Sequence, residues 1–287
     1  MIQSLAGQGY SAKLCCRILG VAPAGYFRWR CRVPTAAELR RHWLAGLILD
    51  IHVASRGTYG RRRIRAELVI GRQLNVSMKL VARVMTEAGL RGLPLGRGRK
   101  RRGGAEATCS DLVQRDFHRD APNLLWMTDI TEHATREGKL YCCVVLDAHS
   151  RRVVGWSIDT TPTAALVSNA LGMAVTHRQP ATGAVVHSDH GSQFTSWVFT
   201  ERVRETGLMP SMGRVGDAFD NAVVESFWAR MQTELLNRRK WRTRVELAGE
   251  IFEYLEIFHN RQRRHSSLGM LTPVEYENAQ KGFVHIA

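Results

Sequence analysis

The hydrophobic and polar positions of the first ninety residues repeat with a helical period. The stretch "YSAKLCCRILGVAPAGYFRWRCR" predicts two short helices around a turn at Gly20. We expect Leu14, Ile18 and Val21 to be the inward positions of this pair. Two short helices joined by a glycine-containing turn have helix-turn-helix spacing, which is common in DNA-binding modules but also in other all-α domains.

A second helical unit follows the first. "AAELRRHWLAGLILDIHVAS" has apolar residues at helical spacing, and "GTYGRRRIRAELVI" opens another helix after a glycine-rich turn. In "NVSMKLVARVMTEAGL", Ser77 suits an N-cap, and Leu80, Val81, Val84 and Met85 share one face. This pattern predicts a second helix-turn-helix candidate.

Beyond residue 110 the pattern changes from helical to alternating. The runs "NLLWMTDITEHA", "KLYCCVVLDAHS" and "RRVVGWSIDT" predict three strands separated by turns. Next come a helix ("TAALVSNALGMAVTHR"), a strand ("GAVVHSD"), a helix ("SWVFTERVRETG"), a short strand ("LMPSM") and a helix ("NAVVESFWARMQTELLNR"). This order predicts a mixed sheet with helices on its faces. The stretch "VELAGEIFEYLEIFHNRQRRHSSLG" predicts a further helix with a basic tail.

The charge is divided unevenly between these two regions. The chain has a net charge of +15, yet residues 1–104 carry 21 Lys and Arg against 4 Asp and Glu, whereas residues 105–287 carry 20 against 22. A basic module joined to a near-neutral one indicates a polyanionic partner. "LPLGRGRKRRGG" has no hydrophobic period, so we expect a linker that can follow a phosphate backbone.

The six cysteines and the apolar runs indicate the compartment. Cys15–Cys16 and Cys142–Cys143 are adjacent pairs, and no Cys-x-x-Cys has a matching histidine pair, so we expect reduced thiols and no structural zinc site. No window is apolar enough for a membrane span, and the N-terminus does not read as a signal peptide. A soluble cytoplasmic protein is predicted.

Three acidic residues stand at positions suited to metal chemistry. Asp129 shares a strand face with Leu125 and Met127, where a carboxylate is costly unless it is paired or bound to a metal. Asp189 follows the fourth strand, and Glu225 lies near the start of a helix. Magnesium prefers oxygen ligands, and metal-assisted phosphoryl transfer uses paired ions held mainly by carboxylates.

The contexts of these acids carry a resemblance. "WMTDIT", "HSDHGSQF" and "DNAVVESF", with 35 residues between Asp189 and Glu225, resemble the DD(35)E signature of retroviral-integrase-like transposases. "DAHSRRVVGW", "FDNAVVESFWARMQTELL" and "HNRQRRHSSLGMLTPVEYE" are similar to the bacterial insertion sequence 3 family, as are "SRGTYGRRRIRAEL" and "VARVMTEAGLRG" in the basic part. The resemblance covers nearly the whole chain.

The resemblance implies a fold and a chemistry. The fold is an RNase H-like mixed five-stranded sheet flanked by helices, preceded by all-α helix-turn-helix modules. Asp129, Asp189 and Glu225 would be catalytic and would hold two Mg²⁺ ions, with Mn²⁺ able to substitute. The activity implied is binding of the terminal inverted repeats of an insertion sequence, followed by strand cleavage by an activated water and attack of the freed 3′-hydroxyl on another phosphodiester.

The resemblance also implies the partners. They are double-stranded DNA of the element ends and the target, further copies of the chain on that DNA, and the product of an upstream reading frame, with which such chains often act as a frameshift fusion. The expected location is the bacterial nucleoid. Two alternatives stay open: a DNA-binding regulator with an inactive nuclease-like domain, and a magnesium-dependent nuclease without joining activity.

The implied boundaries give five segments. They are a first helix-turn-helix (1–33), a second helical DNA-binding module (34–92), a basic linker (93–110), the integrase-like catalytic core (111–240) and a helical segment with a basic tail (241–287).

Candidate DNA contacts are cations of the basic region, two polar residues after Asp189 and two residues of the Glu225 helix. The family usually has lysine seven residues after the glutamate; here that position is Gln232, with Arg230 nearby to supply a cationic contact. Asp147 is expected to organise a turn, and His187 and His190 to support the site or face DNA. The candidate contacts are Lys13, Arg17, Arg28, Arg61, Arg62, Arg63, Lys79, Arg83, Arg99, Lys100, Arg101, Arg102, Ser192, Gln193, Arg230 and Gln232.

Overall fold

The computed structural model describes residues 1–94, 113, 117–212 and 222–284, with the side chains of 281–284 left out. The chain divides into two units, Met1–Leu49 and Asp50–Ala287, and the division falls within helix α4 (Ala36–Ala54). In the described part of the chain, no helix is both long and apolar enough to cross a membrane.

The N-terminal unit holds three short helices before α4. They are α1 (Ile2–Gly7), α2 (Ala12–Ile18) and α3 (Pro23–Arg30), with Gly20 at a φ of +66° in the turn between α2 and α3. The two helices around Gly20 are thus confirmed. Glycine suits this turn because a side chain is strained in the left-handed region.

The predicted inward positions of this unit are wrong. Leu14, Ile18 and Val21 are exposed. The buried side chains are instead Cys15 and Cys16 of α2 and Tyr26 of α3. The reason is that α2 contacts α1 as well as α3, so its covered side differs from that of a two-helix pair.

The second helical module consists of α5 (Arg61–Ala66), a wider π-helical turn η1 (Glu67–Gly71) and α6 (Met78–Glu87). Ser77 Oγ accepts a hydrogen bond from the Leu80 amide at 3.2 Å, which confirms the N-cap. Val81, Val84 and Met85 are buried along one face of α6, as the sequence predicts.

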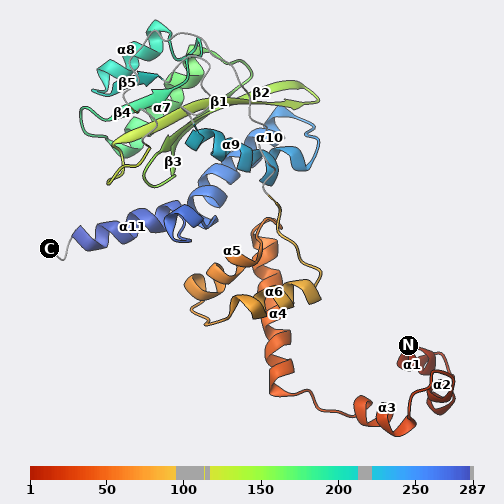
Figure 1. Cartoon of the computed structure of the whole chain (residues 1–287). Helices are drawn as coiled ribbons and strands as arrows, with labels where there is room; N and C mark the ends of the chain where they lie inside the picture. Colours follow the sequence, from red (N-terminus) through yellow and green to blue (C-terminus); the bar gives the residue numbers. More distant parts are fainter. Residues whose placement is uncertain (95–112, 114–116, 213–221, 285–287) are drawn as a thin grey trace. The chain divides into compact units, whose positions relative to one another are not determined.

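The second unit is built on a mixed five-stranded sheet in the order β3-β2-β1-β4-β5 (Figure 1). The first three strands are antiparallel, whereas β1–β4 and β4–β5 are parallel. This sheet confirms the predicted integrase-like fold class. Its strands are β1 (Leu125–Thr135), β2 (Gly138–Asp147), β3 (Val153–Asp159), β4 (Val185–Ser188) and β5 (Met209–Met212).

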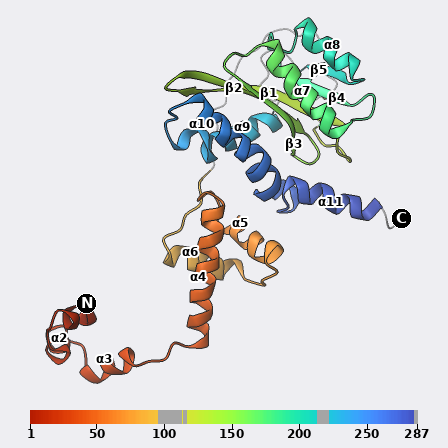
Figure 2. The ribbon, with the colours of Figure 1, turned by 180° about the vertical axis from the view of Figure 1, so that it is seen from behind.

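Helices α7 (Ala164–Arg178) and α8 (Trp197–Glu205) cover one face of the sheet, and α7 crosses it in the view from behind (Figure 2). The core on this face includes Trp126, Val145 and Val186 together with buried residues of both helices. Because successive strand residues point to opposite faces, Asp129 belongs with Leu125 and Met127 on the other face. Helix α9 (Ala222–Glu234) contacts β1 there.

The predicted C-terminal helix is present as α10 (Arg244–Phe252), which runs directly into the π-helical η3 (Glu253–Gln262). The 3-10 turn η2 (Leu236–Arg238) precedes it, and the 3-10 turn η4 (Ser266–Leu268) and α11 (Pro273–Val284) follow it. Arg263 and Arg264, in the predicted tail, are only 1% and 3% exposed.

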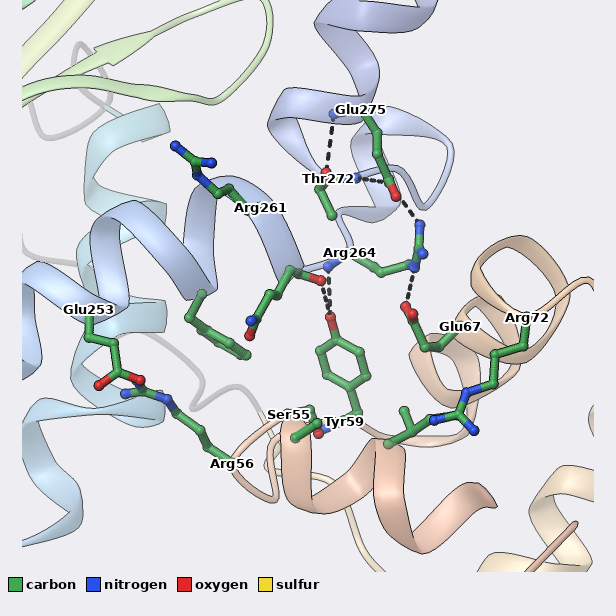
Figure 3. Close-up of a pocket in the computed structure, with 14 residues that line it drawn as sticks. Ser55, Arg56, Tyr59, Glu67, Arg72, Glu253, Arg261, Arg264, Thr272 and Glu275 are labelled. Atoms are coloured by element: carbon green, nitrogen blue, oxygen red, sulfur yellow. Dashed lines mark hydrogen bonds and ion pairs between the residues drawn. The ribbon is translucent and has the colours of Figure 1, made fainter. Parts of the chain in front are cut away.

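Two sets of contacts explain why the tail is buried. The Asn260 side chain donates to the Val153 carbonyl and accepts from the Val153 amide, both at 2.9 Å, so the segment pairs with the edge strand β3. Arg264 then lies between Glu67 of the helical module and Glu275 of α11 (Figure 3). Carboxylates from two elements thus compensate the charge of this buried arginine.

Candidate active site

Asp129 lies in the middle of β1, on the face that α9 covers. Its Oδ1 accepts from the Ile130 amide at 2.8 Å, and its Oδ2 accepts from the Trp228 indole N–H at 3.1 Å. Burial raises the pKa of Asp129 to about 7, with the negative charge of Asp189 adding to the shift and that of Glu225 adding less. These three acids are therefore within electrostatic reach of one another.

Asp189 follows β4 directly. In the parallel β1–β4 pair, Met127 is opposite His187, so Asp129 and Asp189 each lie two residues further on. The Gly191 amide donates to Asp189 Oδ1 at 2.9 Å and orients this exposed carboxylate. Both aspartates line the same hollow of 300 Å³, and Gln193 lines it with them.

Glu225 stands in the first turn of α9 and is exposed. Partial desolvation of its carboxylate raises the pKa of Glu225. Glu225 does not line the hollow of the two aspartates. Among the residues that the structure describes, no three His, Cys, Asp or Glu side chains come close enough to share one metal ion. The structure thus brings Asp129 and Asp189 to one hollow and places Glu225 on α9, within electrostatic reach of Asp129.

Asp147 is a structural residue, as the sequence predicts. It is fully buried, and Oδ1 accepts from the amides of His149 and Ser150 at 3.1 and 2.8 Å and from the Ser150 hydroxyl at 2.9 Å. Its Oδ2 accepts from the Asn123 amide at 2.7 Å. Asp147 organises the turn between β2 and β3.

The two histidines beside Asp189 differ in their surroundings. His187 is buried, and its Nδ1 lies 2.9 Å from Ser211 Oγ of β5, so this ring supports the β4–β5 pair. His190 has a buried Nε2 without a hydrogen-bond partner in the described part of the chain. Asp217 and Asp220, two further acids before α9, lie outside the described residues.

Most of the predicted DNA-contacting cations are on the surface. Arg83 is exposed, and it pairs with Glu87 at 2.8 Å. Arg63 differs from its neighbours because it is half-buried and its Nε donates to the Arg264 carbonyl at 3.0 Å. Ser192 is exposed beside the hollow. The other predicted contacts that are exposed are Lys13, Arg17, Arg28, Arg61, Arg62 and Lys79, whereas Arg99, Lys100, Arg101 and Arg102 lie outside the described residues.

The two candidates on α9 are both half-buried. Burial lowers the pKa of Arg230 to about 10, and the nearby charge of Arg263 contributes to the shift. Gln232 lies two helical turns after Glu225, and its Oε1 accepts from Asn237 Nδ2 at 3.4 Å. Arg230 thus lies among the C-terminal arginines rather than on an open surface, and its role toward DNA stays a prediction.

Two features of the site were not found from the sequence. One is Trp228, whose only signal is a tryptophan one helical turn after Glu225. The other is the joint between the helical module and the C-terminal segment, which encloses a cavity of 540 Å³ (Figure 3). Tyr59 donates to the Gln262 carbonyl at 3.0 Å and accepts from the Arg264 amide at 2.8 Å.

Comparisons with known proteins agree with this architecture. An integrase core domain model matches residues 119–218, a second integrase core domain model matches residues 206–273, and an HTH-like domain model matches residues 38–100. Transposase InsF for insertion sequence IS3A of Escherichia coli K12 is 35% identical over 278 residues, covering 94% of each chain. The insertion element IS600 uncharacterized 31 kDa protein of Shigella sonnei is 34% identical, covering 91% of this chain and 96% of its own.

Integrase structures are more distant. The HTLV-2 integrase catalytic core domain in complex with magnesium is 18% identical with a TM-score of 0.45, covering 56% of this chain and 99% of its own. The simian T-cell lymphotropic virus intasome in complex with the PP2A regulatory subunit B56 gamma is 12% identical with a TM-score of 0.46, covering 80% of this chain and 74% of its own.

Proposed function

Because this chain belongs to the IS3 family of insertion-sequence transposases, we propose that it cuts DNA at the ends of its element and joins the freed ends to target DNA. The observation that supports this chemistry most directly is that Asp129 and Asp189 line one hollow, with Glu225 on the helix that contacts β1. Burial, and then the charges of Asp189 and Glu225, raise the pKa of Asp129. Carboxylates gathered on the central strands of a sheet and on a helix are costly in ionised form, and a divalent cation offsets that cost.

The donor set fits magnesium. All three side chains offer carboxylate oxygens, which are the ligands that Mg²⁺ prefers. Asp129 and Asp189 would hold the metal from the hollow and Glu225 from α9, with two Mg²⁺ ions in the complete site and Mn²⁺ able to replace them. When bound, these ions polarise the scissile phosphate and lower the pKa of the attacking water.

The chain's own contribution is to aim the carboxylates. The Trp228 indole and the Ile130 amide each donate to one oxygen of Asp129. These two bonds fix the orientation of the carboxylate, and with it the direction of the lone pairs left for a metal. The Gly191 amide does the same for one oxygen of Asp189. Preorganised ligands reduce the cost of assembling the site during the reaction.

The proposed partner is double-stranded DNA, both the terminal inverted repeats and the target. The exposed cations of the helical modules, Arg61 and Arg62 among them, support backbone contacts, and Ser192 and Gln193 stand beside the hollow for target DNA. Assembly of several copies on DNA, and a fusion with an upstream reading-frame product, are part of the proposal.

A cleavage-and-joining assay tests the proposal. The full chain is incubated with Mg²⁺ and a labelled duplex that carries one element end and its flank, and we expect both a cut strand and a joined product. Asp129→Asn, Asp189→Asn and Glu225→Gln should each abolish both products and leave DNA binding intact, because an amide does not neutralise the metal ions. Glu205→Gln, at an exposed position of α8, is the matched control and should retain both products.

Each other result selects a different function. Cutting without joining would mean a nuclease, and binding without either product would mean a regulator with an inactive domain. If one of the three amide variants kept normal cleavage, that residue would not be a catalytic ligand.

A further inference from the structure

Two guanidinium groups lie beside one carboxylate near the end of α9, and a third is within electrostatic reach. Arg263, which is 1% exposed, donates from Nε to Glu234 Oε2 at 2.7 Å and from Nη2 to Oε1 at 2.6 Å. The Tyr254 hydroxyl donates to Oε2 at 3.0 Å. Arg63 Nη1 lies 3.9 Å from Oε1, and Arg230 lies within electrostatic reach of the same pair. Glu234 is therefore already saturated by Arg263 and Tyr254.

Positive charge is in excess in this cluster. Arg63, Arg230 and Arg263 face a single described carboxylate, and the nearby Glu67 and Glu275 are both engaged with Arg264. Burial and the charge of Arg263 lower the pKa of both Arg63 and Arg230. The two histidines packed here are neutral, because burial lowers the pKa of His259 to about 3 and lowers that of His265 as well. They therefore leave the charge of the cluster unchanged.

Three buried nitrogens of the same cluster lack hydrogen-bond partners. They are Arg230 Nε, Arg263 Nη1 and His265 Nε2, judged among the residues that the structure describes. Buried polar groups in proteins are normally paired, and a guanidinium can only donate. What the two arginines lack is therefore an acceptor, and a negatively charged acceptor would also offset their charge.

We propose that Arg63, Arg230 and Arg263 form an anion site for a phosphate group, and that this group is a backbone phosphodiester of bound DNA. Arginine is suited to phosphate because its planar fork donates two parallel hydrogen bonds. Arg63 and Arg230 are half-buried, whereas Arg263 is fully buried.

The elements that carry these arginines favour DNA as the source of the phosphate. Arg63 follows the exposed Arg61 and Arg62 on α5, and Arg230 lies five residues after Glu225 on α9. A single phosphate at this site would link the helical module to the helix of the candidate active site. This assignment to DNA rests on the proposed function, whereas the anion site itself does not.

The first experiment uses inorganic phosphate as the probe. The melting temperature of the full chain is measured at fixed pH and ionic strength, with phosphate replacing chloride. We expect phosphate to raise the melting temperature of the parent protein and of Arg204→Gln, a change at an exposed position of α8. Arg230→Gln should abolish this rise. Arg230→Gln should also fold at least as stably as the parent in chloride, because it removes a charge without a partner.

The outcomes of this experiment are decisive. A parent protein without a phosphate-specific rise, or a rise that persists in Arg230→Gln, would overturn the anion site. Arg230→Lys keeps the charge without the fork, and we expect it to retain part of the rise. If Arg204→Gln lost the rise as well, the effect would come from net charge and the site would again be wrong.

The second experiment asks whether DNA supplies the phosphate. Duplex affinity is measured across a salt series, and loss of one phosphate contact should reduce the slope of log affinity against log salt by about one in Arg230→Gln, with Arg204→Gln unchanged. A phosphate-dependent rise with no change of slope would overturn the assignment to DNA. A changed slope in a protein that fails to cut DNA would leave the site standing and remove the proposed catalytic function.

Discussion

The indole N–H of Trp228 donates to Asp129 Oδ2 at 3.1 Å and so joins α9 to β1 at the candidate catalytic aspartate. Trp228 lies one helical turn after Glu225, so this single bond fixes the distance between a strand carboxylate and a helix carboxylate. The ring itself is buried, which leaves the bond little freedom to move.

Trp228→Phe should slow DNA cutting and leave DNA affinity unchanged. The variant keeps an aromatic ring but removes the donor, and a hydrogen bond to a charged group contributes about 1.5–3 kcal/mol. We expect the cutting rate to fall by on the order of tenfold to a hundredfold if that bond orients Asp129 in the transition state. Single-turnover cleavage and duplex affinity are the two measurements.

Trp241→Phe is the matched control for that change. Trp241 is also buried and donates its indole N–H, but to the Leu236 carbonyl, at 2.9 Å, rather than to one of the three acids. It should lower stability without a specific effect on cutting. Equal cutting rates for the two variants would show that the Trp228 bond acts on stability alone.

Gly155→Ala should destabilise the fold. Gly155 lies in β3, where an added Cβ would collide with the Ala170 carbonyl and the backbone and side chain of Ala174 on α7. Overpacking against backbone typically costs about 1–3 kcal/mol. Urea unfolding measures the loss. Gly249→Ala, in open space on α10, should instead stabilise by up to about 1 kcal/mol, and a loss at both positions would contradict the close-approach argument.

The free energy of unfolding should decrease as the pH drops below about 6.5, because two histidines are buried in neutral form. Burial lowers the pKa of His259 to about 3 and lowers that of His265, whereas the unfolded chain takes up protons near pH 6.5. The unfolded state thus binds more protons below pH 6.5, and the free energy of unfolding declines from there as pH drops. The slope is about 1.4 kcal/mol per pH unit for each such histidine.

The useful window for this measurement is pH 5 to 6.5, where protonation of Asp129, whose pKa is about 7, acts in the opposite direction but is common to the parent and the histidine variants. Glu234 and Glu277 have lowered pKa values, and their contribution is lost only as pH falls below the ordinary value of 4.5. His259→Gln should flatten the slope in that window, while His177→Gln on the exposed end of α7 should not. An unchanged slope in His259→Gln would mean that His259 is charged in the folded protein.

Local patterns predicted those parts of the molecule that local physics determines. The alternation of apolar and polar residues predicted the strands. Ser77 caps α6 as expected, and Asp147 organises the turn between β2 and β3 as expected. The three acids were found because each stands in a recognisable sequence context, although their mutual geometry depends on the β1–β4 register and on Trp228. Their catalytic role remains a prediction.

The errors come from contacts between distant segments. The sequence does not show that Arg263 and Arg264 are buried, because their partners Glu234, Glu67 and Glu275 come from three other elements. Likewise, Leu14 is exposed because α1 covers a different side of α2. No pattern within a single helix contains this information.

Gln232→Lys tests how the DNA end meets α9. Gln232 lies seven residues after Glu225, hence on nearly the same face of the helix. Within the described part of the chain, its side chain is held by a 3.4 Å hydrogen bond from Asn237. If DNA follows this face, a lysine here should gain a charge-assisted phosphate contact and steepen the slope of log affinity against log salt by about one.

The control for that test adds the same charge to a neighbouring face. Thr233 follows Gln232 but points about 100° away around α9, so Thr233→Lys should leave the salt slope nearly unchanged. Equal steepening by both lysines would indicate a general field rather than a contact at position 232. An unchanged slope for Gln232→Lys would mean that this face of α9 does not meet DNA. The assignment of the three acids would survive that result, because it rests on β1, β4 and the first turn of α9 rather than on where the DNA end lies.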